Sequence, residues 1–136
     1  MNQTTIDYGM RTRVSAPYDQ AVAQVTAALK AEGFGVLTTI DVQATLKQKL
    51  DVDFRRYVIL GACNPPLAYR ALTAEAEIGL LLPCNVIVYE DEGGAGCTIS
   101  IIDPHVMLGV GINPSLAPVA DEAAARLRRV LAALGS

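Results

Sequence analysis

The chain has 136 residues, of which 51% are apolar and 18% are charged, and this composition excludes an intrinsically disordered protein. The formal net charge is −3, without the basic face that neutralises phosphates, so we expect no nucleic-acid partner. The longest apolar stretch, residues 78–88, is shorter than the ~20 residues of a membrane-spanning helix, and the odd count of three cysteines argues against a disulfide framework.

The first half of the chain predicts two strands and two helices. Residues 6–14 alternate between apolar and more polar side chains, which is typical of a half-buried strand. Ser15 is a favoured N-cap, and apolar residues at helical spacing then predict a helix that stops at Gly33. A second strand is expected over residues 34–40, and Asp41 is expected to cap a short helix after it.

The second half predicts three strands and two helices. Residues 57–62 are apolar and rich in β-forming residues, which predicts a strand at the centre of the sheet. Asn64 precedes two prolines and is expected to cap a third helix. Residues 85–90 and 97–102 predict two strands joined by a glycine-rich turn, so this pair is antiparallel. Asn113 precedes another proline and is expected to open a last helix that runs to about residue 134.

These elements follow one another in the order β-α-β-α-β-α-β-β-α, and only residues 105–112 fit no single element. The hairpin excludes a sheet in which all strands are parallel. We therefore expect an α+β fold, in which the helices pack on one face of a mixed or antiparallel sheet.

Three short motifs in this order resemble those of a known family. They are GFGVLTTIDV at residues 33–42, LGACNP at residues 60–65 and LLLPCNV at residues 80–86. Together they resemble the family catalogued as domain of unknown function 302, and the resemblance extends over about residues 8–134. It implies a compact α+β domain with a curved sheet, similar to the saddle-like fold of the TATA-binding protein, and it implies a homodimer. It implies no activity, and a shared fold does not carry DNA binding with it.

The most unusual local feature is a repeated Cys-Asn pair. Cys63 and Asn64 lie at the end of a predicted strand, before a helix N-terminus whose dipole favours a thiolate. Cys84 and Asn85 lie at the start of another strand, so the two thiols would be close together if these strands are neighbours. The alternative is that both cysteines are inert packing residues, while Asn64 only caps its helix and Asn85 only holds a loop.

His105, the only histidine, could join Cys63 and Cys84 in a binding site for a soft metal, Cu(I) or Zn. Met107 adds a thioether, a ligand that suits Cu(I). No CxxC or HxxxH spacing requires such a site, so the alternative is an exposed loop histidine and no cofactor.

Arg55 and Tyr57 stand at the start of the third predicted strand. Side chains alternate along a strand, so we expect these two on one face and Arg56 on the other. On a sheet face without helices, Arg55 and Tyr57 could bind an anion or an aromatic group. The alternative is a pair of solvated charges at the edge of a strand.

The sequence contains no recognisable catalytic set or phosphate-binding glycine loop. We therefore expect a module that is not an enzyme, lies in the cytoplasm without membrane contact, and forms one domain over residues 1–136. It is expected to form a homodimer through the uncovered sheet face and to act as a ligand-binding or assembly module, with any small ligand held on that face. The alternative is a thiol-dependent protein that uses Cys63 and Cys84 to bind a soft metal or to handle redox or sulfur chemistry.

Overall fold

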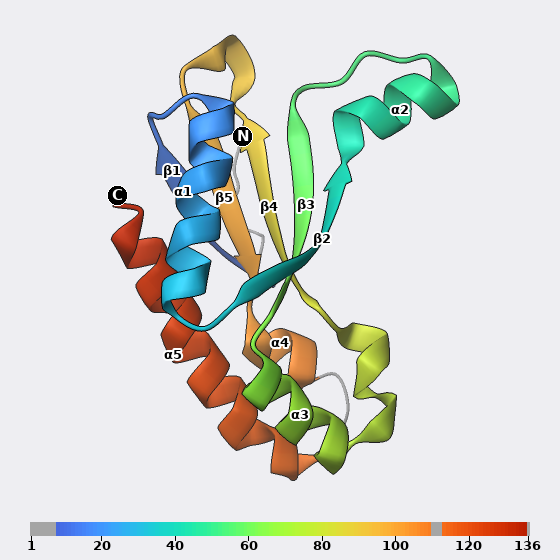
Figure 1. The fold of residues 1–136 in the computed structure, drawn as a ribbon, viewed down its shortest axis with the longest axis vertical. Coiled ribbons are helices and arrows are strands. Elements are labelled where there is room, and N and C mark those ends of the chain that lie inside the picture. The colour runs from blue at the N-terminus through green and yellow to red at the C-terminus, as the bar shows by residue number, and fades with distance from the viewer. Residues whose placement is uncertain (1–7, 110–112, 136) are drawn as a thin grey trace.

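The computed structural model describes residues 8–109 and 113–135, and its centre is a five-stranded sheet (Figure 1). All neighbouring strands are antiparallel, in the order β1-β5-β4-β3-β2. The strands are β1 (Gly9–Val14), β2 (Gly35–Asp41), β3 (Tyr57–Cys63), β4 (Cys84–Glu90) and β5 (Cys97–Ile102). The α+β expectation is therefore confirmed, and its sheet is antiparallel rather than mixed. The strand predicted to be central, β3, lies one place away from the middle, which β4 occupies.

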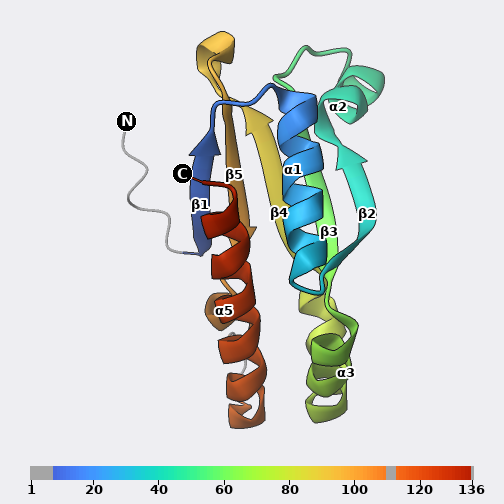
Figure 2. The ribbon, with the colours of Figure 1, turned by 60° about the vertical axis from the view of Figure 1, so that its left-hand side comes forward.

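The helices α1 and α5 lie along one face of the sheet, and α3 lies beyond its end (Figure 2). Within the described residues, no helix lies across the opposite face, which we call the open face. The α-helices are α1 (Tyr18–Ala31), α2 (Val42–Leu50), α3 (Pro65–Ala74), α4 (Pro104–Leu108) and α5 (Ala117–Ala133), and the 3-10 helices are η1 (Ala76–Leu81), η2 (Glu92–Gly94) and η3 (Pro114–Leu116). None of the described helices is both long and apolar enough to cross a membrane.

The predicted caps of α2 and α3 are formed, whereas Asn113, predicted to open the last long helix, caps the short η3, and α5 begins at Ala117 without a side-chain cap. The side chains of Asp41, Asn64 and Asn113 accept hydrogen bonds from backbone N–H groups of the following turn at 2.9, 3.2 and 2.9 Å, and these residues precede α2, α3 and η3. The prediction for Ser15 was wrong, because Pro17 occupies the N-cap position of α1 and no side chain caps that helix. A residue before proline avoids the helical conformation, so a helix could not begin directly after Ser15.

The sequence patterns missed helix α4. The side chain of Asp103 caps it by accepting a hydrogen bond from the backbone N–H of His105 at 2.9 Å. The helix has only five residues, which is too short for helical periodicity to show. It matters for the site because it carries the buried side chains of Met107 and Leu108. The rest of the ambiguous segment, residues 110–112, lies outside the described residues.

The hydrophobic core lies between the sheet and the helices α1 and α5. The strands supply β-branched and leucine side chains that are at most 4% exposed, and burying each such side chain contributes about 1.5–3 kcal/mol to folding. The core residues of the strands are Val58, Leu60, Val86, Val88, Ile99 and Ile101, and those of the two helices include Val25, Leu29, Leu127 and Val130.

Candidate functional site

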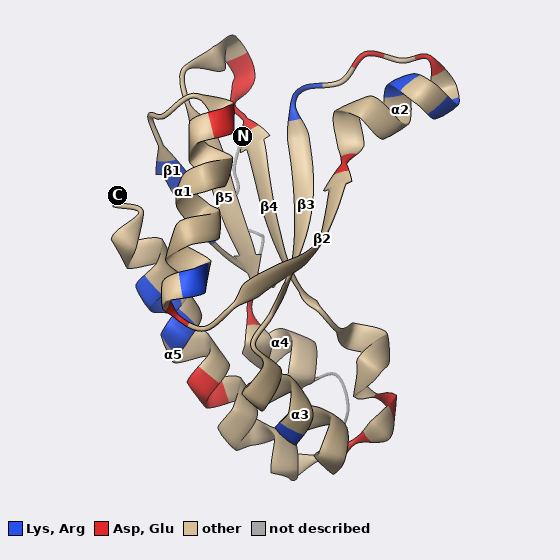
Figure 3. Cartoon of the chain, viewed as in Figure 1, with Lys and Arg blue, Asp and Glu red and all other residues tan. Residues whose placement is uncertain are grey.

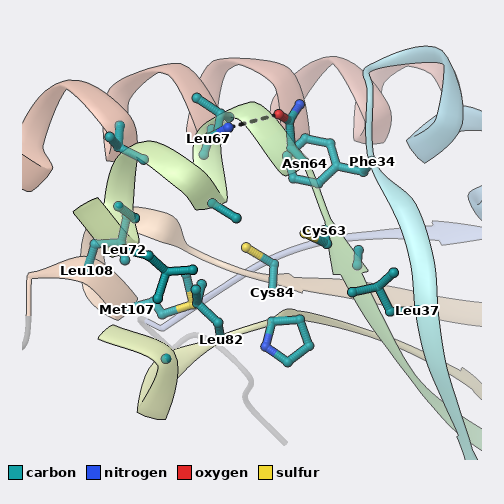
Figure 4. Close-up of a pocket in the computed structure, with 17 residues that line it drawn as sticks. Phe34, Leu37, Cys63, Asn64, Leu67, Leu72, Leu82, Cys84, Met107 and Leu108 are labelled. Carbon is teal, nitrogen blue, oxygen red and sulfur yellow. Dashed lines mark hydrogen bonds between the residues drawn. The ribbon is translucent and has the colours of Figure 1, made fainter. Parts of the chain in front are cut away.

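An apolar cavity of about 320 Å³ lies where β3 and β4 leave the sheet and meet α3, η1, α4 and α5 (Figure 4). Its wall is mostly aliphatic, and Asn64 is the one lining residue with a polar side chain other than the sulfur-containing residues. Among the described residues, no charged side chain lines it. Large wall residues include Phe34, Leu67, Leu82 and Leu108.

Two thiols line this cavity. Cys63 ends β3 and Cys84 begins β4, and the two strands are neighbours in the sheet. Ala62 is the direct partner of Cys84, so Cys63 lies diagonally next to it. In Figure 4 the sulfur atoms of Cys63 and Cys84 lie on the same side, toward the cavity. Burial, with a smaller effect of charge on Cys63, raises the pKa of the Cys84 thiol to about 11, so this thiol is protonated at neutral pH.

The two asparagines that follow the thiols have different environments. Asn64 is buried, and its Nδ2 donates to the carbonyl oxygen of Glu32 at 3.4 Å, in addition to capping α3. The side chain of Asn85 is exposed, and it borders a hollow on the open face of the sheet rather than the cavity. The repeated Cys-Asn pair therefore brings together the two thiols, and its second asparagine lies away from the cavity.

His105 does not join the thiols. It is exposed on α4, and its Nε2 lies 2.7 Å from Oδ1 of Asp121 on α5. Met107, two residues further along α4, is 8% exposed and lines the cavity instead. Residues two apart on a helix point in nearly opposite directions, so His105 and Met107 cannot face the same space. Within the described residues, no three His, Cys, Asp or Glu side chains come together to hold a metal ion.

A second group of predicted residues lies on the open face. The rings of Tyr57 and Tyr89 stack at 5.4 Å between centroids, and the guanidinium of Arg55 lies 5.2 Å from the Tyr89 centroid. Arg56 extends toward the sheet face that carries the helices, and its guanidinium lies 4.4 Å from the ring centroid of Tyr18. Sequence reasoning missed Tyr89, although its pairing with Tyr57 follows once β3 and β4 are placed side by side.

The open face contains a shallow hollow of about 440 Å³ beside this aromatic pair. Its floor includes Ile87 and Ser100, which are direct partners across β4 and β5. The Ser100 hydroxyl oxygen is buried and has no hydrogen-bond partner among the described residues. Arg11 is the direct partner of Ser100 on β1 and borders the same hollow. The open face therefore combines apolar, aromatic and polar groups.

These features define a small α+β domain, in which an antiparallel sheet has helices on one face and an apolar, thiol-lined cavity at its end. The chain belongs to the family described as domain of unknown function DUF302, whose sequence profile matches residues 10–134. It is similar to the crystal structure of the uncharacterized conserved protein DUF302 from Bacillus stearothermophilus, with a TM-score of 0.85 and 31% sequence identity. The match covers 94% of this chain and 98% of that chain. No curated protein matches the sequence.

Proposed function

We propose that this protein is a non-catalytic module that binds a small apolar molecule in the cavity between α3 and the ends of β3 and β4. The observation that carries this proposal is the 320 Å³ volume of a cavity without charged lining. Small-molecule sites usually measure about 300–1,000 Å³, and an engineered apolar cavity of about 150 Å³ holds benzene. The cavity therefore fits an uncharged molecule about twice the size of benzene, such as a bicyclic aromatic compound.

The chemistry of the lining supports binding without catalysis. General acid–base catalysis needs a group that exchanges protons near the working pH. The titratable side chains of the lining are Cys63 and Cys84, and burial raises the pKa of Cys84 to about 11. A protonated thiol is a poor nucleophile, so Cys84 serves as an apolar wall toward a neutral ligand.

The proposal is tested by titration with 1-naphthylamine, an uncharged bicyclic probe whose fluorescence changes in apolar surroundings. We expect saturable binding of one probe per chain. Ala68→Leu adds volume to a cavity-lining position and is expected to weaken binding at least tenfold. The matched control is Ala23→Leu, which makes the same change on the exposed side of α1. Failure of the wild-type protein to bind, or equal affinity of the wild-type and Ala68→Leu proteins, would reject this function.

We also propose that the open face pairs with a second copy of the chain. Its half-buried Ile59 and Ile87 and the stacked tyrosines form an apolar surface, and the Ser100 hydroxyl lacks a partner among the described residues. An exposed apolar surface and a buried hydroxyl without a hydrogen-bond partner are both energetically unfavourable in an isolated chain. A twofold axis is the commonest symmetry of soluble assemblies, and a second copy would cover the isoleucines and provide polar partners.

The assembly is tested by light scattering coupled to gel filtration. The dimer proposal predicts a mass twice the 14.4 kDa of one chain. Ile87→Lys places a charge in the open face and is expected to yield monomers, whereas Thr26→Lys on the exposed side of α1 is expected to leave the dimer intact. A wild-type monomer would contradict this part of the proposal.

A further inference from the structure

Three sulfur-containing side chains line the same cavity. Cys63 and Cys84 come from neighbouring strands, and Met107 comes from α4 (Figure 4). The third cysteine, Cys97, lies elsewhere, and its Sγ donates to the carbonyl oxygen of Ala16 at 3.6 Å. The chain thus gathers two of its three thiols and one thioether in a single apolar space.

The types of ligand in this group select among metals. Thiolates and thioethers favour Cu(I), whereas carboxylates, carbonyls and water favour hard cations such as Mg²⁺. Zn²⁺ sites are usually four-coordinate and take their ligands from Cys, His, Asp and Glu. The cavity provides two such residues, Cys63 and Cys84, and His105 pairs with Asp121 outside it. The group therefore fits Cu(I) better than zinc.

The side chains can also adjust around an ion. Cys63 follows Ala62, the direct partner of Cys84, so it lies one position along β3 from this pair, and both thiols line the same cavity. Met107 has an unbranched side chain with three rotatable bonds, so its sulfur can move within the cavity. Cys63 is partly exposed, which gives a small Cu(I) complex a route to the thiols.

We propose that the cavity is a Cu(I) site, in which the Sγ atoms of Cys63 and Cys84 are the principal ligands and the Sδ atom of Met107 is the third. The site shares the cavity of the proposed function but does not depend on binding of an apolar molecule. Formation of each Cu–thiolate bond releases one proton, so one Cu(I) displaces two protons and no electron is transferred.

This proton balance predicts a pH dependence. Among the described residues that line the cavity, the titratable groups are the two thiols. Where both ligands enter the complex as thiols, release of two protons per ion makes the affinity for Cu(I) rise about 100-fold per pH unit. Binding through one thiol would give a rise of about tenfold.

The test is an anaerobic competition between the reduced protein and the Cu(I) chelator bathocuproine disulfonate, with Cu(I) supplied as its acetonitrile complex. We expect one Cu(I) per chain and two protons released per ion. Cys63→Ser and Cys84→Ser are each expected to weaken binding at least 100-fold. Met107→Leu keeps the shape of the side chain but removes the sulfur, and it is expected to weaken binding about tenfold. Cys97→Ser is the matched control and is expected to bind as the wild-type protein does.

The proposal is overturned if the wild-type protein takes no Cu(I) from the chelator, or if the Cys63 and Cys97 variants bind it equally well. Should Cys84→Ser fail to fold, Cys63→Ser and Met107→Leu still decide the question, because Cys63 is partly exposed and leucine resembles methionine in size. Ala68→Leu separates the two proposals, since it should block the naphthylamine probe and leave the sulfur ligands in place.

Discussion

Asn64 and Asn85 follow cysteines in two similar motifs, yet their predicted contributions to stability differ. Asn64 accepts a hydrogen bond from the backbone N–H of Leu67 at 3.2 Å and caps α3. Loss of a cap usually costs about 1 kcal/mol, so Asn64→Ala should lower the free energy of unfolding by about that amount. Asn85 is exposed, and Asn85→Ala should change it by less than about 0.5 kcal/mol. Urea unfolding measures both values, and equal losses would contradict the assigned roles.

Gly61 is required at its position in β3 because two side chains occupy the space beside it. A Cβ atom there would collide with Oγ1 of Thr38 and would lie 2.8 Å from Cγ of Pro83. Such crowding typically costs about 1–3 kcal/mol, so Gly61→Ala should lower the midpoint of thermal unfolding. Gly35→Ala is the matched control, since a Cβ at Gly35 meets nothing within 4 Å. A Gly61→Ala protein as stable as the control would show that Thr38 and Pro83 move aside easily.

At the scale of the elements, Asp91 links the β4–β5 turn to β1. It accepts hydrogen bonds from Thr98 at 2.6 Å and from Arg13 at 2.8 Å. Burial tends to raise the pKa of Asp91, but these hydrogen bonds and the charge of Arg13 outweigh it and hold the pKa below its ordinary value. The ionised carboxylate therefore stabilises the fold above the pKa of the unfolded chain, about 4, and this contribution is lost as the pH falls through the lower folded value.

Asp91→Asn removes this pH-dependent contribution. The difference in the free energy of unfolding between the wild-type and variant proteins should be largest near neutral pH and should shrink as the pH falls below about 4. Urea unfolding at several pH values measures it. Asp53→Asn is the control, because the Asp53 side chain is 97% exposed and surface ion pairs contribute little. A difference for Asp91→Asn that does not vary with pH would contradict the electrostatic assignment.

Most single elements could be predicted because their signals are local. The capping side chains of Asp41 and Asn64 lie within three residues of the N–H groups that they bind, so the sequence alone indicates them. The order of the strands depends on pairing between distant residues. β1 pairs with β5, for example Gly9 with Ile102, and this pairing places β4 rather than β3 in the middle. The short helix α4 was missed because its five residues show no periodicity.

At the scale of the whole molecule, the candidate site could be predicted only in part. The repeated Cys-Asn pair indicated Cys63 and Cys84 as candidate site residues, but their proximity depends on the pairing of β3 with β4. Met107 lines the cavity and His105 does not, because of the orientation of α4, which the sequence did not predict. The cavity itself is space that several elements leave unfilled, and no local pattern encodes it.

The distribution of charge over the molecule is the basis on which a nucleic-acid partner is not expected. Along α5 the acidic residues come first and the three arginines follow, and two of these, Arg126 and Arg129, pair with Glu122 and Glu32 (Figure 3). The described residues therefore show a short group of arginines rather than a continuous basic stripe. Binding to phosphate backbones requires such a basic surface. The absence of a nucleic-acid partner stays a prediction, and a mobility-shift titration at low salt tests it: we expect no shift, and salt-dependent binding would contradict it.

The central claim, that the cavity beside Cys63 and Cys84 holds a small apolar ligand, is tested most directly by a crystal of the protein under xenon pressure. Xenon enters dry, apolar cavities that are large enough to hold it. We predict a strong xenon peak between Leu67 of α3 and Cys84 of β4, and loss of this peak in Ala68→Leu crystals. A cavity without xenon, or one filled with ordered water, would contradict the account.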